Sequence, residues 1–367
     1  MLAENKREKA TPAMIAAIAI APKLISQNNF ALRIYKVCAI LQARKVGETM
    51  ADTDSTPRRI LNIETKESIK QHFGIDVDSE IFSPIVDYAF KRIFTADEVR
   101  SKIALMDFLN SVLEFEKAKQ IVDLTVINPE IPIDIATSKK SVFDIRVKFN
   151  DGEQAIVEMQ LSNHSGFKKR AQFLISKAYV SQPISGLEFS ALRKCYLICI
   201  TNFMFPASKP ELVDDYRYRD KRGNDLTDDQ TIVFIELPKT EKILNKLVDE
   251  MTNIEQWAIF FRYVSDKSRR DIINRIIGRK EGIKMATDVL ELISKDEKER
   301  IRYESELIFD LDQRSRVNGA WQEGSIQRAH TIARNMLKRN RPIYEVTEDT
   351  GLDETTVTQL KRELDSD

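Results

Sequence analysis

Apolar residues recur at helical spacing between residues 83 and 117, and the pattern breaks near Thr95, so this part of the chain predicts two helices. Ser83 and Pro84 suit the N-cap and the first helical position of the first one. The span 165–182 is amphipathic at the same spacing, and the chain after Glu241 is patterned as helix throughout. No repeat of roughly 20 to 50 residues is present, which excludes solenoids and propellers.

Between these helical spans, four runs have the composition of strands. Residues 141–149 and 154–161 flank Asn150-Asp151-Gly152 and give the strongest hairpin signal in the chain. Residues 195–205 and 231–237 are typical of largely buried strands. Helices and strands in this order, followed by helices alone, predict an α/β core with an all-α C-terminal region.

The register of the hairpin depends on the length of its loop. A two-residue Asp151-Gly152 turn would pair Phe149 with Gln154 and place Glu158 on an apolar face. A three-residue loop, with Gly152 at the left-handed position of a bulge, pairs Lys148 with Gln154 instead. Because this second register separates apolar from polar residues, we expect it, and it sets Asp144 opposite Glu158.

In this register the hairpin has one polar side, on which Asp144 and Glu158 face each other. Directly opposed carboxylates repel, and a divalent cation neutralises them. Two carboxylates with substrate phosphate and water suit Mg²⁺, which can activate water for attack on a phosphate. A structural alternative is a pair of solvated carboxylates balanced by Arg146 and Lys148. The apolar side is expected to hold Phe143, Ile145, Val147, Ala155, Val157 and Met159.

Composition narrows the class of protein. Lysine plus arginine and aspartate plus glutamate both total 57, so DNA binding would need local basic surfaces. The three cysteines form no CxxC pair, which argues against a disulfide scaffold and fits a cytoplasmic setting. The apolar run 13–21 is too short to cross a bilayer and only faintly resembles a signal peptide, so no membrane association is expected. Scattered histidines without an HExxH pair disfavour a zinc hydrolase.

Between residues 83 and 239 a series of short motifs follows in order: Asp87-Tyr-Ala-Phe90-Lys91 with Phe94, Phe108-Leu-Asn110, Phe143-Asp144-Ile-Arg-Val, Asp151-Gly152, Ile156-Val-Glu158-Met-Gln160, Phe167 with Lys169-Arg170, Ser176-Lys-Ala-Tyr179 with Gln182, and Phe234-Ile-Glu-Leu-Pro-Lys239. This ordered series resembles the Rpn family of recombination-promoting nucleases and putative transposases, a branch of the PD-(D/E)xK superfamily. The resemblance implies a restriction-endonuclease-like core, that is, a mixed sheet flanked by helices.

The resemblance also implies the catalytic residues. Asp144 matches the motif aspartate, Glu158 the second acid, and Gln160 the position where the superfamily usually has lysine. By this resemblance Asp144 and Glu158 are the expected metal ligands. Glutamine cannot supply positive charge to the attacked phosphate, so the metal and a lysine from elsewhere must supply it, and Lys91 and Lys177 are the candidates.

Further residues have two interpretations each. Asp87 stands where the superfamily often places an additional acid, yet it also suits a helix N-terminus and an i,i+4 pair with Lys91. Arg170 and Lys177 share one helical face that suits DNA phosphates or simply solvent. Residues 325–343 are basic, and 343–364 has a helix-turn-helix outline. From this tail we expect an accessory DNA or partner contact, with packing as the alternative, through Arg334, Lys338 and Arg339.

Four segments follow from these patterns: an N-terminal extension at 1–78, with Met50 as an alternative start, a nuclease-like core at 79–240, a helical region at 241–320, and a basic helical tail at 321–367. The expected function is Mg²⁺-dependent DNA endonuclease activity of limited sequence specificity that promotes recombination or transposition. The alternative is a non-catalytic DNA-binding or interaction protein that keeps the fold. The sequence leaves the oligomeric state open and allows a homo-oligomer.

Overall fold

The computed structural model describes residues 61, 63–114, 119–127, 130–131, 141–163, 166–182, 188–206 and 209–366. The apolar run 13–21 and the alternative start at Met50 lie outside these residues. All described residues fall within one compact unit, Arg59–Asp367. No helix in this described part is long and apolar enough to span a membrane.

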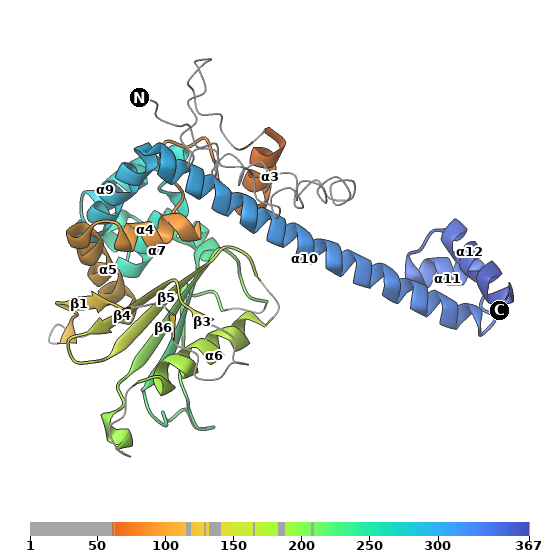
Figure 1. Ribbon diagram of the computed structural model, residues 1–367, viewed down its shortest axis with the longest axis horizontal. Coiled ribbons are helices and arrows are strands. Elements are labelled where there is room, and N and C mark those ends of the chain that lie inside the picture. The colour runs from red at the N-terminus through yellow and green to blue at the C-terminus, as the bar shows by residue number, and fades with distance from the viewer. Residues whose placement is uncertain are drawn as a thin grey trace, which may run out of the picture. The chain divides into compact units, whose positions relative to one another are not determined.

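A mixed six-stranded sheet in the order β1-β4-β5-β6-β8-β7 forms the centre of the unit (Figure 1). Neighbours β5, β6 and β8 run parallel, and the other neighbouring pairs are antiparallel. The strands are β1 (Leu124–Val126), β4 (Ile145–Phe149), β5 (Gln154–Gln160), β6 (Cys195–Thr201), β7 (Val213–Tyr216) and β8 (Gln230–Glu236), with a separate pair of β2 (Glu130–Ile131) and β3 (Ser141–Val142). The predicted α/β class is confirmed.

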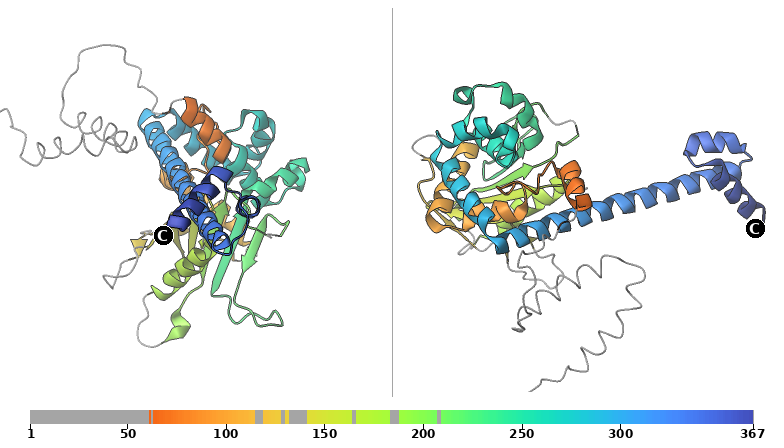
Figure 2. Two further views of the ribbon diagram at one scale, coloured as in Figure 1. Left: turned by 90° about the vertical axis from the view of Figure 1, so that its right-hand side faces the viewer. Right: turned by 90° about the horizontal axis from the view of Figure 1, so that it is seen from above.

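Helices cover both faces of this sheet (Figures 1 and 2). One face packs against α4, α5 and α7 in the main hydrophobic core, and the other packs against α6 in a second core. The helices are α3 (Ile63–Phe73), α4 (Asp87–Thr95), α5 (Glu98–Leu113), α6 (Phe167–Val180), α7 (Asn253–Tyr263), α8 (Arg270–Ile277), α9 (Glu281–Lys295), α10 (Glu297–Leu337), α11 (Ile343–Thr350) and α12 (Glu354–Ser366). Short 3-10 helices cover Phe189–Ala191, Leu237–Asn245, Val248–Glu250 and Lys267–Arg269.

The predicted hairpin register is confirmed. Lys148 pairs with Gln154, and Ile145 pairs with Val157. Gly152 has a φ of 90°, and its amide donates to the carbonyl of Phe149 at 3.0 Å. A side chain at this φ would be strained, so glycine fixes the three-residue loop and with it the pairing of every residue in the hairpin.

The expected strand 141–149 is interrupted, and the expected position of Phe143 is wrong. β3 ends at Val142 and β4 begins at Ile145, because the chain bends at Asp144. Phe143 therefore packs in the second core beside Ile156, whereas Ile145 belongs to the main core. On the polar side of the hairpin Gln154 and Glu158 are buried where α6 packs on Ile156, whereas Lys148 is exposed.

Two helices broken near Thr95 are present as predicted, but the first begins later than expected. Pro84 lies in a turn, closed by the amide of Val86 donating to Ser83, and α4 starts at Asp87. The amide of Ser83 donates to the hydroxyl of Tyr303 in α10 at 3.0 Å, so this residue anchors α10 instead of capping α4.

The helices after Glu241 contribute to the same core as the sheet. Trp257 and Phe261 of α7 lie with Phe94 and Phe108 in an aromatic cluster, in which the rings of Phe108 and Trp257 are 5.4 Å apart. Aromatic pairs at this separation add to the stabilisation from burial. Trp257 also donates to Asp107 of α5 at 2.8 Å, which connects the C-terminal helices to the first core helices.

The end of α10 forms a third hydrophobic cluster with α11 and α12. Gly351, with a φ of 69°, turns the chain between α11 and α12, as the helix-turn-helix outline requires. The buried members of this cluster are Ala333, Leu337, Val346, Val357 and Leu360.

Candidate active site

Asp144 and Glu158 meet where the bend before β4 lies beside β5. The amide of Asp144 donates to Oε1 of Glu158 at 3.1 Å, and the amide of Met159 donates to Oδ2 of Asp144 at 2.9 Å. Glu158 is only 2% exposed. The bend at Asp144 thus brings its carboxylate, which is 16% exposed, to the backbone of β5 beside the buried carboxylate of Glu158. The alternative of a solvated pair on an open strand face is excluded by this burial.

Two cations from different helices contact this pair. Nζ of Lys91 in α4 lies 3.2 Å from Oδ1 of Asp144 and 2.6 Å from Oδ2 of Asp87. Nη2 of Arg170 in α6 lies 3.1 Å from Oε2 of Glu158. Lys91 therefore forms the i,i+4 ion pair with Asp87 and a second ion pair with Asp144. Arg170 forms an ion pair with Glu158.

Burial of the carboxylates dominates the electrostatics. It raises the pKa of Asp144 to about 6, with nearby Asp87 adding to the rise and Lys91 opposing it. It raises the pKa of Glu158 to about 8, with Asp144 adding and Arg170 opposing. Burial lowers the pKa of Lys91, but attraction to Asp144 and Asp87 outweighs it and the pKa stands well above its usual value. The negative charge of the group is therefore only partly compensated.

A cavity of about 300 Å³ opens over these residues. Its wall includes Gln160, whose Oε1 accepts a hydrogen bond from Arg170 at 3.3 Å. It also includes Glu306 and Asp310 of α10, which sequence reasoning missed. The only sequence signal for them is two acids four residues apart on a helix, which is common on solvated helices. The lining residues are Ile85, Asp87, Asp144, Glu158, Met159, Gln160, Leu161, Ser162, Arg170, Glu306, Phe309, Asp310 and Gln313.

The remaining predicted contact residues lie elsewhere. Lys177 is on α6, two turns beyond Arg170, and does not line the cavity. In the C-terminal cluster, Arg334 of α10 pairs with Glu363 of α12 at 3.0 Å, whereas Lys338 and Arg339 are exposed. The structure therefore brings Asp87, Lys91 and Arg170 to the motif residues and leaves the tail residues as a separate surface.

The carboxylates fit a magnesium ion. Among the described residues no three His, Cys, Asp or Glu side chains are arranged to hold a metal. Mg²⁺ does not need such a cluster, because it engages one or two carboxylates and retains several waters. In the described part of the chain Oδ1 of Asp87 is also buried without a hydrogen-bond partner on this cavity. Asp144 and Glu158 thus offer hard oxygen donors beside an unsatisfied carboxylate oxygen.

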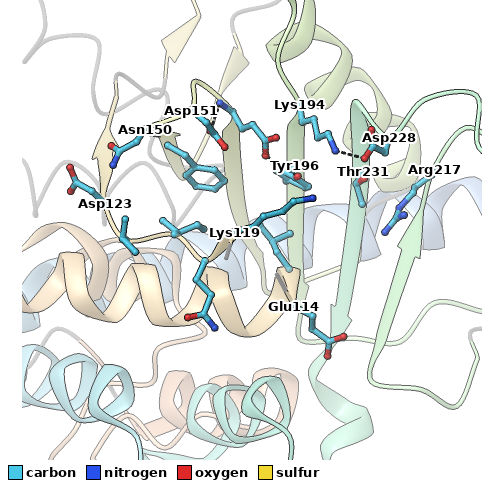
Figure 3. A pocket seen from close by; sticks show the side chains of 16 residues that line it. Glu114, Lys119, Asp123, Asn150, Asp151, Lys194, Tyr196, Arg217, Asp228 and Thr231 are labelled. Atoms are coloured by element: carbon cyan, nitrogen blue, oxygen red, sulfur yellow. Dashed lines mark hydrogen bonds and ion pairs between the residues drawn. The ribbon is translucent and has the colours of Figure 1, made fainter. Parts of the chain in front are cut away.

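A larger cavity, of about 570 Å³, lies at the other end of the hairpin (Figure 3). Asn150 and Asp151 of the hairpin loop line it, Lys194 bonds to Asp228, and the hydroxyl of Tyr196 donates to Glu153 at 2.9 Å. Its volume exceeds that of the cavity at Asp144, but none of the motif residues lines it. The smaller cavity, which Asp144, Glu158 and Gln160 line, is therefore the candidate active site.

The sequence profile of the family described as PD-(D/E)XK nuclease family transposase matches residues 84–320. This match covers the sheet, both covering layers of helices and the first half of α10. The chain belongs to this family, and the expected relationship to PD-(D/E)xK nucleases and transposases is confirmed. Comparison with curated proteins and with solved structures gives no match.

Proposed function

We propose that the protein is a divalent-metal-dependent DNA endonuclease whose metal ligands are Asp144 and Glu158. The observation that carries the proposal is the incompletely compensated carboxylate pair of Asp144, just before β4, and the buried Glu158 on β5, which faces a cavity in a chain of the nuclease family. Cleavage of limited sequence specificity that promotes recombination or transposition is the finer form of the proposal.

Three side chains of the site have separate roles in hydrolysis of the phosphodiester. Mg²⁺, when bound, supplies an activated water and stabilises charge on the attacked phosphate. Lys91 supplies the positive charge that Gln160 cannot, because its ammonium lies 3.2 Å from Asp144 and stays protonated. Arg170 lines the cavity with a side chain that is 45% exposed, so its guanidinium can also hold a phosphate oxygen. Gln160 orients Arg170 through its Oε1.

Incubation of supercoiled plasmid with the full chain tests the proposal. We expect nicked or linear DNA with Mg²⁺, intact DNA with EDTA, and intact DNA with Glu158→Gln in Mg²⁺. Asp312→Asn, a change on α10 outside the cavity, is the matched control and should cut like the wild type. Intact plasmid across several divalent ions would reject the nuclease function.

The second candidate is a DNA-binding or interaction protein that retains the fold without catalysis. The observation that favours it is that Arg170 and Lys91 already engage both motif acids, while Gln160 replaces the usual lysine. This candidate predicts DNA retention at unchanged plasmid integrity. The same plasmid assay, with a gel-shift measurement beside it, separates the two functions.

A further inference from the structure

The proposed hydrolysis needs a group that takes a proton from the attacking water, and the motif residues do not provide one. Gln160 has no basic atom that can accept this proton. Lys91 is held between Asp87 and Asp144 and remains protonated, because their attraction raises its pKa. Asp144 and Glu158 are assigned to the metal. The acceptor must therefore come from another part of the cavity wall.

Helix α10 presents two carboxylates to this cavity, Glu306 and Asp310. They are four residues apart and share a helical face. Within the described residues neither forms a hydrogen bond or an ion pair with another side chain. Carboxylates left without partners on one wall of a cavity repel each other, so this arrangement costs stability unless protons or cations are taken up.

α10 is fixed to α4 just before these carboxylates, so their position is defined. Arg92 of α4 bonds to both oxygens of Glu299, at 3.0 and 3.2 Å, and Tyr88 bonds to the same carboxylate. One turn later Tyr303 is fully buried, stacks on Phe82 at 4.2 Å and accepts from the amide of Ser83. These contacts hold the cavity face of α10 over Asp87, the first residue of α4.

Asp310 has the proton affinity that such an acceptor needs. Burial, then the charges of Glu306 and Asp87, raise its pKa to about 7. Burial and Asp87 also raise the pKa of Glu306, although Lys91 opposes that rise. A base that titrates near the working pH is the most effective proton acceptor. The other charged groups around the cavity are Asp144, Glu158 and Arg170.

We propose that Asp310 is the general base of the hydrolysis, a role that rests on the proposed nuclease function. The water oxygen forms a bond to phosphorus while the bond from phosphorus to the leaving oxygen breaks. The proton of the water passes to the carboxylate of Asp310, and the leaving oxygen takes a proton from solvent. Asp310 then returns its proton to solvent, so one water is consumed per bond cut. Glu306 is a positioning residue that keeps Asp310 basic.

The test is single-turnover plasmid cleavage by the full chain at saturating Mg²⁺, from about pH 5 to about pH 9. Wild-type cleavage should rise with pH, because Asp310, whose pKa is raised to about 7 in the metal-free protein, must be ionised to accept a proton. Asp310→Asn should cut about 100-fold more slowly and lose this rise. Asp310→Glu should recover part of the rate and the pH dependence, and Asp312→Asn should match the wild type. Calorimetric titration with Mg²⁺ should give an affinity for Asp310→Asn within a few-fold of the wild type.

A wild-type rate and pH profile in Asp310→Asn, while the wild type cuts, would overturn this role and leave the nuclease function standing. A rate loss that disappears when more Mg²⁺ is added would also overturn it, because Asp310 would then serve metal binding. A wild-type chain that fails to cut would reject the nuclease function and the general base together.

Discussion

Asp144→Asn should make the metal-free protein more stable than the wild type above about pH 6. The side chain of Asp144 is only 16% exposed, and desolvation raises its pKa to about 6 from the usual 3.8. In the window between these values the folded chain binds more protons than the unfolded chain, so the free energy of unfolding falls as pH rises. Each pKa unit corresponds to about 1.4 kcal/mol, which gives a loss of about 3 kcal/mol for this carboxyl. Asparagine does not ionise, so the variant avoids the loss.

Urea unfolding in EDTA, at several values between about pH 4 and about pH 8, measures the effect as the difference between variant and wild type. This difference should shift toward the variant by about 3 kcal/mol across the window, since contributions of groups that do not interact with Asp144 cancel. Asp312→Asn, on α10 outside the cavity, is the matched control. Mg²⁺ at about 100 times its Kd should then stabilise the wild type by about 2.7 kcal/mol and leave Asp144→Asn unchanged.

Parallel pH profiles for the wild type and Asp144→Asn would refute the reasoning, because the carboxylate would then be fully compensated in the fold. Equal stabilisation of both proteins by Mg²⁺ would place the ion elsewhere. A variant that unfolds much more easily at every pH would make Asp144 a structural residue that holds the amide of Met159.

Lys91→Met should slow plasmid cleavage about 100-fold while calorimetry still detects Mg²⁺ binding, because the metal carboxylates remain and only the positive charge is lost; a wild-type rate would assign the ammonium to packing. Gly282→Ala should destabilise the fold by about 1–3 kcal/mol in urea, since a Cβ there would lie 2.3 Å from that of Asp107; unchanged stability would show that α5 and α9 can separate. Truncation after Gly319 should leave the main core folded by circular dichroism but weaken DNA binding and flatten its salt dependence in anisotropy titrations; an unchanged salt slope would assign the tail to assembly.

The hairpin shows what a single sequence can determine. The alternation of Ile145 and Val147 and the loop glycine are local features, and local geometry converts them into a register. The opposition of Asp144 and Glu158 followed from that register and is observed. The bend at Asp144 did not follow, because it depends on a hydrogen bond to the backbone of β5.

Burial of the polar hairpin face was beyond the local pattern. Gln154, Glu158 and Gln160 alternate as on a solvated strand, but Gln154 and Glu158 are buried where α6 packs on Ile156. The short strands β1 and β7 were also missed, since β1 has three residues, of which only Leu124 is buried. In each case the structure depends on a contact with a distant part of the chain, and the local periodicity of the sequence does not predict such contacts.

The α10 carboxylates are the clearest case, because about 150 residues separate them from Glu158 in the sequence. Their presence changes the charge of the site: among the described residues, five carboxylates face the cavity region, and Lys91 and Arg170 form the ion pairs that offset them. Burial and the excess of negative charge raise the pKa of Asp144, Glu158 and Asp310. Protons therefore neutralise this excess at low pH. At higher pH a divalent cation is the remaining way to neutralise it before a phosphate can approach. The charge that destabilises the metal-free fold is thus the same charge that would bind the metal, so the stability of the metal-free protein and its metal affinity should change in opposite directions in variants of Asp144 and Glu158.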